Sequence, residues 1–539
     1  MAEIKHVDLI VGLEIHVELS TRTKMFSRAP NVAHAANFDA PPNTLIDPVV
    51  LGLPGALPVM NLAAVETSMM VGMALGCSIS PLSRWDRKSY FYPDLPKNYQ
   101  ISQYQLPLCF DGSVELPPIT ADGRIDYEAL TTEAAKDLPG KRIGIIRAHL
   151  EEDAGKLLHE APGGFALDPP GSIADYNRAG TPLLEIVTQP DFTSADEVVV
   201  FCRLLRNICR FVGASAGILQ RGHIRFEPNI NTRLTLSDGR TVKTPIVEIK
   251  NLNSFKAVKG AIEFERREQP RRWQADGLEL RPGAKTTRGW DDARAETLLQ
   301  REKEEAHDYR YFPDPDLPPV MVDETWRERV RTGLPELPLA RARRYMLEFG
   351  LSAKEAAAIT DEWEVCSFYD QTVEAAVALG VQRERAGRLA ANFILQSGAK
   401  RANELTTAEQ TILPSDLGIS PGSVAQIVHL RAEDKIGANA ADELFGLLCR
   451  GGEEFVESGD AASIESIARA RTMLIVRDAG ALEGWCDQAI AANPKVADDV
   501  RAGKLQAAGR LVGEVMKLAG GAADAKSARE TLLKKLGQA

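Results

Sequence analysis

Short apolar runs separated by Gly and Pro dominate the sequence up to about residue 322. Runs at residues 9–19, 183–187 and 244–249 have the length of strands and are rich in β-branched residues. The Gly and Pro residues between such runs indicate turns. This pattern predicts a mixed α+β body for the first three fifths of the chain.

The run at residues 9–19 alternates with a period of two: Glu14, His16 and Glu18 stand between apolar residues at positions 13, 15, 17 and 19. Because successive side chains of a strand point to opposite faces, two carboxylates and an imidazole share one face, about 6.5 Å from one to the next. Such a face is either the solvated side of an edge strand or a set of candidate ligands for a hard cation.

Helical spacing replaces the strand pattern after residues 334–338, where the sequence LPELP contains two prolines. From there to about residue 451 the sequence is rich in Ala, Leu, Glu and Arg with helical periodicity. We therefore predict an α+β fold in three domains: residues 1–325, an all-helical connector at 326–460, and a small helical tail at 461–539.

The tail contains two helix signals. Asn493-Pro494 predicts an N-cap followed by Pro at the first helical position. Apolar residues at positions 505, 508, 512, 515 and 519 then recur every three or four residues. From spacing alone, this region is a helical bundle that needs no ligand.

Composition limits the class of protein. The chain has 539 residues, 44% hydrophobic and 26% charged, with a net charge of -11, which argues against binding nucleic acid over its whole surface. The tail from residue 461 is locally basic, with 12 Lys and Arg against 9 Asp and Glu. Acidic residues interrupt the N-terminus, and we expect no membrane span. The seven cysteines form no CxxC pair, so we expect reduced thiols in a cytoplasmic protein.

Further acidic residues follow strand-like runs. The sequence HLEEDAGK begins at His149 and contains Glu151, Glu152 and Asp153, and Glu185 lies inside an apolar run. Three adjacent carboxylates are either a solvated charge run or partners of a cation, and a buried Glu185 needs a metal ion or an arginine. Strand alternation puts Glu151 and Asp153, and not Glu152, on the same face as His149.

Cations occur beside aromatic and amide side chains at residues 87–94, which include Lys88, and at residues 250–256, which begin with Lys250. Either segment is suited to hold phosphates or to stack on a base. The sequence contains no GxxxxGK[ST] phosphate loop, no GxSxG elbow and no Gly-Ser-rich stretch of a Ser-Ser-Lys amidase. It therefore shows no means of hydrolysing an amide.

Seven long stretches of the first 320 residues follow one another in the order of a known family. They are VGLEIHVELSTRTKMFS from Val11, LGLPGALPVMN from Leu51, DRKSYFYPDLPKNYQISQ from Asp86, HLEEDAGK from His149, NRAGTPLLEIV from Asn177, EIKNLNSFKAV from Glu248 and AHDYRYFPDPDLPP from Ala306. These stretches resemble the B subunit of the three-subunit aspartyl/glutamyl-tRNA amidotransferase. The stretch ANPKVADDVRAGKLQAAGRLVGEVMK from Ala492 is similar to the carboxyl-terminal domain of that family, and residues 340–460 match only weakly.

The resemblance implies an activity and its cofactors. Glu-tRNA(Gln) or Asp-tRNA(Asn), charged with the wrong acid, has its side-chain carboxylate phosphorylated by ATP, and ammonia then displaces the phosphate. It implies a cradle-like catalytic domain, with His16, Glu152 and Glu185 as Mg²⁺ ligands. Glu14, Lys88 and Lys250 are the expected catalytic or substrate contacts.

The resemblance also implies partners. A glutaminase of the amidase family, the A subunit, would supply ammonia through a channel, and a small C subunit would complete a heterotrimer. The tail domain would bind tRNA(Gln) or tRNA(Asn), with the cations Lys495, Arg501, Lys504 and Arg510 as candidate contacts.

One stretch departs from the family pattern. Where many members read MxEGSLRCDAN, this chain reads LQRGHIRFEPN at residues 219–229, with Arg221 in place of an acid and Glu227 in place of an aspartate. Two alternatives therefore stand beside the amidotransferase interpretation: an enzyme that forms an acyl phosphate on aminoacyl-tRNA for another product, and a noncatalytic tRNA-binding scaffold.

Overall fold

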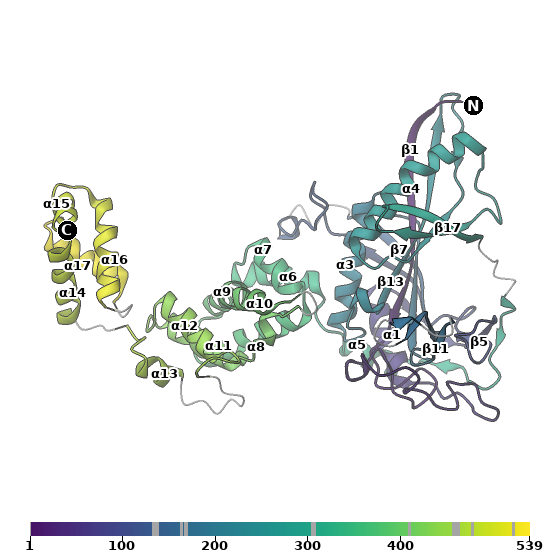
Figure 1. Ribbon diagram of the computed structural model, residues 1–539, viewed down its shortest axis with the longest axis horizontal. Coiled ribbons are helices and arrows are strands. Elements are labelled where there is room, and N and C mark those ends of the chain that lie inside the picture. The colour runs from purple at the N-terminus through teal and green to yellow at the C-terminus, as the bar shows by residue number, and fades with distance from the viewer. Residues whose placement is uncertain are drawn as a thin grey trace. The chain divides into compact units, whose positions relative to one another are not determined.

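The computed structural model describes residues 2–131, 140–161, 165–166, 171–302, 309–407, 411–454, 464–475, 479–519 and 523–538. The chain divides into two compact units, Met1–Pro338 and Leu339–Ala539 (Figure 1). All named strands belong to the first unit, and the named elements of the second are helical. The predicted α+β class is confirmed. The division into three domains at 325/326 and 460/461 stays a prediction.

A ten-stranded sheet organises the first unit, in the order β17-β16-β15-β13-β1-β12-β7-β6-β2, with β14 paired to β13. The strands are β1 (Ile4–Glu18), β2 (Ser78–Ile79), β6 (Cys109–Glu115), β7 (Arg142–Glu152), β12 (Pro182–Thr188), β13 (Ile224–Leu236), β14 (Thr241–Lys243), β15 (Val247–Lys250), β16 (Thr286–Asp291) and β17 (Glu296–Glu302). Only β15 and β16 of these pair in parallel. The strand expected at residues 9–19 is thus the long β1, at the centre of the sheet.

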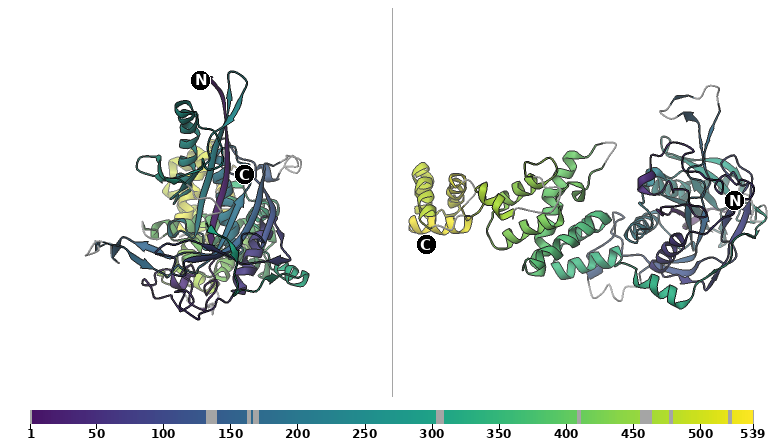
Figure 2. Two further views of the ribbon diagram at one scale, coloured as in Figure 1. Left: turned by 90° about the vertical axis from the view of Figure 1, so that its right-hand side faces the viewer. Right: turned by 90° about the horizontal axis from the view of Figure 1, so that it is seen from below.

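Three helices form a layer on the sheet: α1 (Leu62–Ala74), α3 (Ala195–Phe211) and α4 (Phe255–Asp276). Helix α3 contacts both α1 and α4, α1 contacts β6 and β7, and α4 contacts β1 and β13 (Figures 1 and 2). Trp273 of α4 packs in one apolar cluster with Leu234 and Leu236 of β13. The helices therefore cover an apolar face, and the polar side chains of the strands are directed to the other.

Shorter elements border the polar face. A three-stranded sheet joins β18 (Phe312–Pro313), β4 (Asp86–Ser89) and β5 (Tyr99–Ser102), and β5 contacts β7. The remaining short strands pair as β3 (Leu82–Ser83) with β19 (Val320–Met321), β8 (Lys156–Leu158) with β11 (Ile173–Asp175), and β9 (Glu160–Ala161) with β10 (Phe165–Ala166). Helix α5 (Glu324–Thr332) follows β19. Of the family-like stretch at residues 306–319, positions 306–308 lie outside the described residues.

The second unit contains two groups of helices that differ in their cores. The first group is α6 (Pro338–Phe349), α7 (Ala353–Thr360), α8 (Trp363–Ala378), α9 (Arg383–Asn392), a π-helical segment (Phe393–Gly398), α10 (Ala399–Leu405), α11 (Pro421–Ala432), α12 (Ala438–Leu448) and α13 (Ile464–Ala470). The second is α14 (Ala479–Ala492), α15 (Pro494–Arg501), α16 (Ala508–Leu518) and α17 (Ala525–Lys535). These last four share an apolar core of their own, which includes Cys486, Leu511 and Leu532.

The tail helices follow the predicted spacing closely. Pro494 is the first residue of α15, and the apolar residues at positions 508, 512 and 515 lie on α16, whose C-cap is Ala519. Asn493 precedes α15, but its side chain makes no cap bond and donates to the carbonyl of Ala489 instead (Nδ2–O 3.2 Å). The expected helix start is therefore right, and the expected capping bond is absent at this residue.

Two further expectations concern the whole chain. Among the helices of the described residues, none combines the length and the apolar character that a bilayer crossing needs. All seven cysteines are free thiols, and six of them are buried.

Candidate active site

Four neighbouring strands place polar side chains in one row across the open face of the sheet. His16 on β1 pairs with Arg225 on β13 and with Glu185 on β12, and Glu185 pairs in turn with His149 on β7. Directly opposed residues of antiparallel strands point to the same face. The row Arg225, His16, Glu185, His149 is thus assembled from residues up to about 210 positions apart in sequence.

A parallel row lies one step along the strands. Glu14 pairs with Glu227 on β13 and with Val187 on β12, and Val187 pairs with Arg147 on β7. A third row joins Glu18 and Glu151 across Leu183. The polar face therefore has acids at its centre and arginines at two of its edges.

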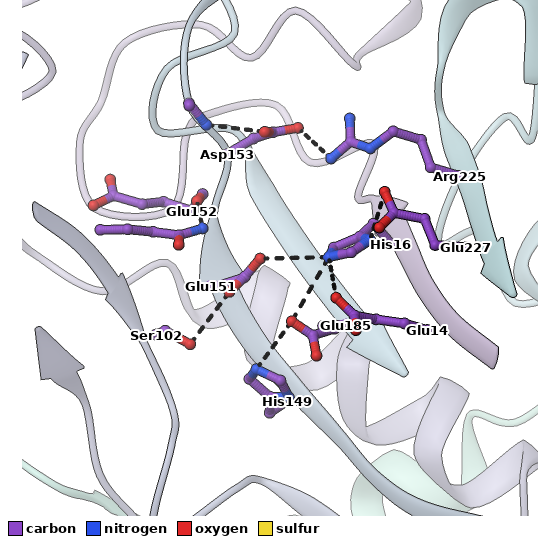
Figure 3. A network of polar contacts seen from close by, with 12 residues as sticks. Glu14, His16, Ser102, His149, Glu151, Glu152, Asp153, Glu185, Arg225 and Glu227 are labelled. Atoms are coloured by element: carbon purple, nitrogen blue, oxygen red, sulfur yellow. Dashed lines mark hydrogen bonds and ion pairs between the residues drawn. The ribbon is translucent and has the colours of Figure 1, made fainter. Parts of the chain in front are cut away.

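His16 lies at the centre of four carboxylates (Figure 3). Its Nε2 atom is 3.6 Å from Glu185 Oε2, 3.8 Å from Glu14 Oε1 and 4.0 Å from Glu151 Oε1. Its Nδ1 atom is 4.0 Å from Glu227 Oε1. The ligand atoms of His16, Glu151 and Glu185 lie within 4.8 Å of one another, as do those of Glu14, His16 and Glu227. We refer to His16, Glu14, Glu151, Glu185 and Glu227 as the acidic cluster.

The electrostatics of the acidic cluster show that it needs positive charge. Burial lowers the pKa of His16, but Glu185, Glu227 and Glu14 outweigh it and raise this pKa to about 9. Burial and the nearby Glu185 raise the pKa of Glu151 to about 7. Burial opposes ionisation of Glu185 too, yet His149 and His16 hold its pKa well below its usual range. Carboxylates so close together repel one another unless protons or a cation lie among them.

Glu152 does not join the acidic cluster. Its carboxylate makes an ion pair with Lys97 and accepts a hydrogen bond from the backbone N–H of Ile101 on β5 (3.0 Å). The reason is strand alternation, which turns Glu152 to the face opposite that of Glu151. The structure thus brings Glu151 to the position that the resemblance assigned to Glu152.

A second ionic group borders the acidic cluster. Arg225 donates to Glu18 Oε1 (3.1 Å) and to Asp153 Oδ2 (2.8 Å), and Arg178 lies 3.7 Å from the same Asp153 oxygen. Although burial raises the pKa of Asp153, the two arginines lower it to about 2, whereas burial and Asp153 raise that of Glu18 to about 7. These acids already have cationic partners and complete the wall of the site.

A cavity of about 1260 Å³ opens over this face. Glu14, His16, Lys88, Glu185 and Lys250 all line it, whereas Glu152 does not. The structure thus brings together five of the six residues expected in the catalytic domain.

The two expected lysines lie on different walls of the cavity. Lys250 Nζ donates to Glu227 Oε2 (2.8 Å) and lies 3.9 Å from Glu248 Oε1. Lys88 Nζ lies over the rings of Tyr309 (4.8 Å to the centroid) and Tyr90 (5.8 Å). Lys250 therefore neutralises an acid of the cluster, while Lys88 faces the cavity from an aromatic wall.

The residues that depart from the family pattern lie mostly outside the cavity. Arg221 pairs with Asp39 (2.9 Å) and lies over the ring of Phe38, and His223 packs against the same ring (centroids 4.9 Å apart). Of the departing positions, Glu227 lines the cavity within the described part of the chain. Glu227 keeps the carboxylate and brings it to His16.

The four tail cations are exposed. Arg501 pairs with Asp498 (2.8 Å) and Lys504 with Asp499 (2.9 Å). Lys495 and Arg510 make no ion pair with any described residue. The structure therefore leaves two of these cations locally neutralised and two without an acidic partner.

Sequence reasoning did not select His149, Glu227 or Arg147 as site residues, although all three line the cavity. The sequence did group Arg147, His149 and Glu151, because they are alternate residues of one strand and therefore lie on the same face. No local signal could join β13 to β1, because their register depends on contacts between distant segments.

The fold and the site define a class of protein. A polar cavity that holds buried carboxylates, an imidazole, flanking cations and aromatic rings is suited to an enzyme that handles phosphorylated substrates with a divalent cation.

Comparison with known proteins identifies the family. Residues 9–328 match the GatB/GatE catalytic domain, and residues 371–536 match the GatB domain. The chain is 39% identical to the B subunit of the aspartyl/glutamyl-tRNA(Asn/Gln) amidotransferase of Rhodopirellula baltica, over 95% of this chain and 93% of that protein. It is 40% identical to the corresponding protein of Synechococcus elongatus (98% and 97%) and 38% identical to that of Carboxydothermus hydrogenoformans (99% and 99%). The chain belongs to the family of B subunits of aspartyl/glutamyl-tRNA(Asn/Gln) amidotransferases.

Proposed function

We propose that this protein catalyses the ATP-dependent amidation of misacylated Glu-tRNA(Gln), Asp-tRNA(Asn) or both, in the cytoplasm. The observation that carries the proposal is the acidic cluster, placed in the cavity beside Lys88 and Lys250. Family membership supports the reaction class. Residues 1–325 would be the catalytic domain, 326–460 a helical connector and 461–539 the tRNA-binding tail.

The chemistry explains why cations and carboxylates occur together. A carboxylate is a poor acyl electrophile, so it is first activated: a side-chain carboxylate oxygen of the misacylated amino acid attacks the γ-phosphorus of ATP, and ADP leaves with the electrons of the broken P–O bond. Ammonia then attacks the acyl carbon, the C–O bond to phosphate breaks, and inorganic phosphate leaves with the proton that the nitrogen loses. Lys88 would stabilise charge on the transferred phosphoryl group.

The residues of the acidic cluster fit a hard divalent cation such as Mg²⁺. The fit rests on the four carboxylates around His16 and on the raised pKa values of His16 (about 9) and Glu151 (about 7) among them. His16, Glu151 and Glu185 would hold the ion, with Glu14 and Glu227 close by, and Glu151 replaces Glu152 in this set. A bound Mg²⁺ would neutralise charge on the phosphate oxygens of ATP. Lys250, which donates a hydrogen bond to Glu227, would keep that carboxylate oriented towards the cavity.

Ammonia must come from another chain, because this sequence lacks an amidase signature. A glutaminase of the amidase family and a small third chain would form a heterotrimer with this protein, and the tail cations Lys495, Arg501, Lys504 and Arg510 would contact tRNA phosphates.

The test is conversion of Glu-tRNA(Gln) and Asp-tRNA(Asn) by the co-purified complex with ATP, Mg²⁺ and either glutamine or ammonium. We expect Gln-tRNA or Asn-tRNA from both nitrogen donors and no product from the Glu185→Gln complex. Mass analysis of the amino acid released from the tRNA distinguishes an amide from another product. Absence of ATP hydrolysis with both charged tRNAs would instead favour a noncatalytic scaffold.

A further inference from the structure

The cations that line the cavity differ in whether acids neutralise them. Arg225 is bound by Glu18 and Asp153, and Lys250 by Glu227. The side chains of Arg147 and Lys88 make no hydrogen bond or ion pair with any residue that the structure describes. The acidic floor of the cavity is thus bordered by two cations whose charge is available to a ligand.

Arg147 is held in place without being neutralised. Its Cζ atom lies 5.9 Å from the ring centroid of Tyr104, which stacks on Tyr311 with centroids 4.2 Å apart and an angle of 10° between the rings. Its Nε–H is buried and has no acceptor in the described structure. A buried charged donor without a partner is costly, so a bound anion is the simplest reason for its position.

The strand register places Arg147 next to the acidic cluster. Arg147 precedes His149 by two residues on β7, so the two side chains share a face about 6.5 Å apart. Across the sheet it lies in the same row as Glu14. Arg147 and Lys88 both line the cavity that holds the acidic cluster. Both cations are thus close to the position where a metal ion would be held.

We propose that Arg147, together with Lys88, forms the site that binds the phosphate groups of the nucleotide. A guanidinium binds phosphate through two parallel N–H···O bonds, which an ammonium cannot do. In nucleotide enzymes, phosphate oxygens commonly bridge a metal ion and such cations. The aromatic pair Tyr104 and Tyr311 fixes the guanidinium before the nucleotide arrives. This inference rests on the proposed function, because it assigns a substrate contact within the same cavity.

The alternative source of phosphate is the 3′ end of the tRNA. Arg147 lies on the floor of the cavity, in the row of Glu14 and one row from His16 and Glu185, which favours the nucleotide. The two sources predict different kinetic effects, so one set of variants separates them.

The experiment compares Arg147→Gln with Arg142→Gln in the complete complex. Arg142 lies on the same strand but is exposed and does not line the cavity. Because a hydrogen bond to a charged group accounts for about one to two powers of ten in affinity, we expect the Kd for ATP with Mg²⁺ to rise about 10- to 100-fold in Arg147→Gln. Arg147→Lys should give a smaller rise, and Arg142→Gln no change. The KM for misacylated tRNA should stay the same.

Thermal unfolding separates binding from a structural role. Without nucleotide, Arg147→Gln should not lower the Tm, because no acid among the described residues pairs with the guanidinium and would be left unpaired. The rise in Tm that ATP causes should become smaller. A lower Tm of the nucleotide-free variant with unchanged ATP affinity would overturn the proposal. A higher KM for tRNA with unchanged ATP affinity would also overturn it and assign Arg147 to the tRNA end.

Equilibrium binding of ATP does not require turnover. If the wild-type complex binds ATP but forms no amide, the proposed function fails, and the role of Arg147 is still decided by the binding data. If the wild-type complex binds no ATP, the proposed function and the proposed role of Arg147 both fail.

Discussion

The polar face of the central sheet and the helical tail carry their charges in different ways. On the sheet, Glu151 and Glu185 are almost completely buried and lie within 4.0 Å of His16. In the tail, Arg501 and Lys504 are exposed and pair with acids three to five residues away. The sheet joins charges from four strands, whereas the tail pairs neighbours within or just after one helix.

This difference has an energetic consequence. Exposed pairs contribute about 0–1 kcal/mol each, because water screens them and long side chains lose entropy. Removing one partner of a buried pair costs about 3–5 kcal/mol, because the other charge is left without compensation. Removing a single charge on the sheet is therefore expected to have a large effect, whereas removing a single charge in the tail is expected to have a small one.

The largest effect is expected for Glu151→Gln, with Glu152→Gln as its matched control. The two variants make the same chemical change, but the two side chains lie on opposite faces of the strand. Glu151→Gln should lower kcat for amide formation from ammonium at least about 100-fold, because a lost metal ligand removes several kcal/mol of transition-state stabilisation. Glu152→Gln should act chiefly on stability, through Lys97 and Ile101. Tm and tRNA affinity measured with and without Mg²⁺ serve as controls. Loss of activity in Glu152→Gln alone would return the ligand role to Glu152.

An intermediate effect is expected at His223, a buried imidazole next to the site. Burial and Arg221 lower its pKa from 6.5 to about 4. Between these two pH values, the imidazole binds a proton in the unfolded chain but not in the folded chain. The free energy of unfolding therefore falls as the pH falls from about 6.5 to about 4, and the contribution of His223 is fully present above pH 6.5. The loss between pH 7 and pH 5 should be about 2 kcal/mol.

Denaturant unfolding of wild type and His223→Phe at both pH values checks this prediction. The variant should lose less stability than the wild type on acidification. The same pH dependence in both proteins would show that His223 is accessible to protons in the folded state.

The smallest effects are expected in the tail, where two matched double variants each remove two positive charges. Lys495→Gln with Arg510→Gln should reduce the salt dependence of tRNA binding by about 0.7–0.9 per lost phosphate contact. Arg501→Gln with Lys504→Gln should change it less, because Asp498 and Asp499 already neutralise these cations. The measurement is the slope of log K against log salt concentration. Deletion of all residues after Ala491 should reduce the salt dependence of tRNA binding more than either double variant does. Unchanged binding after that deletion would contradict a tRNA role for the tail.

Much of the local structure was predictable from the sequence. The alternation at residues 9–19 predicted a strand with Glu14, His16 and Glu18 on one face, and β1 ends at Glu18. The Pro at position 494 predicted the start of α15. These predictions succeeded because a period of two or of 3.6, and the missing N–H of proline, act within a few residues.

The assembly of the site was not predictable in the same way. Strand alternation grouped Glu151 with His149, but no local feature showed that this face, and not that of Glu152, meets His16. Glu227 and Arg225 reach the cluster through the pairing of β13 with β1, which joins segments about 210 residues apart. A register shift of one residue would turn each of these side chains to the other face.

The sequence by itself determined the family, the types of element and which side chains share a face within one strand, because these follow from local periodicity and long motifs. The tertiary structure alone decided that Glu151 belongs to the acidic cluster and that Arg147 lines the cavity without an acidic partner among the described residues. The physical reason is that hydrogen-bond ladders between distant strands set the register, and the helix layer determines which face stays open.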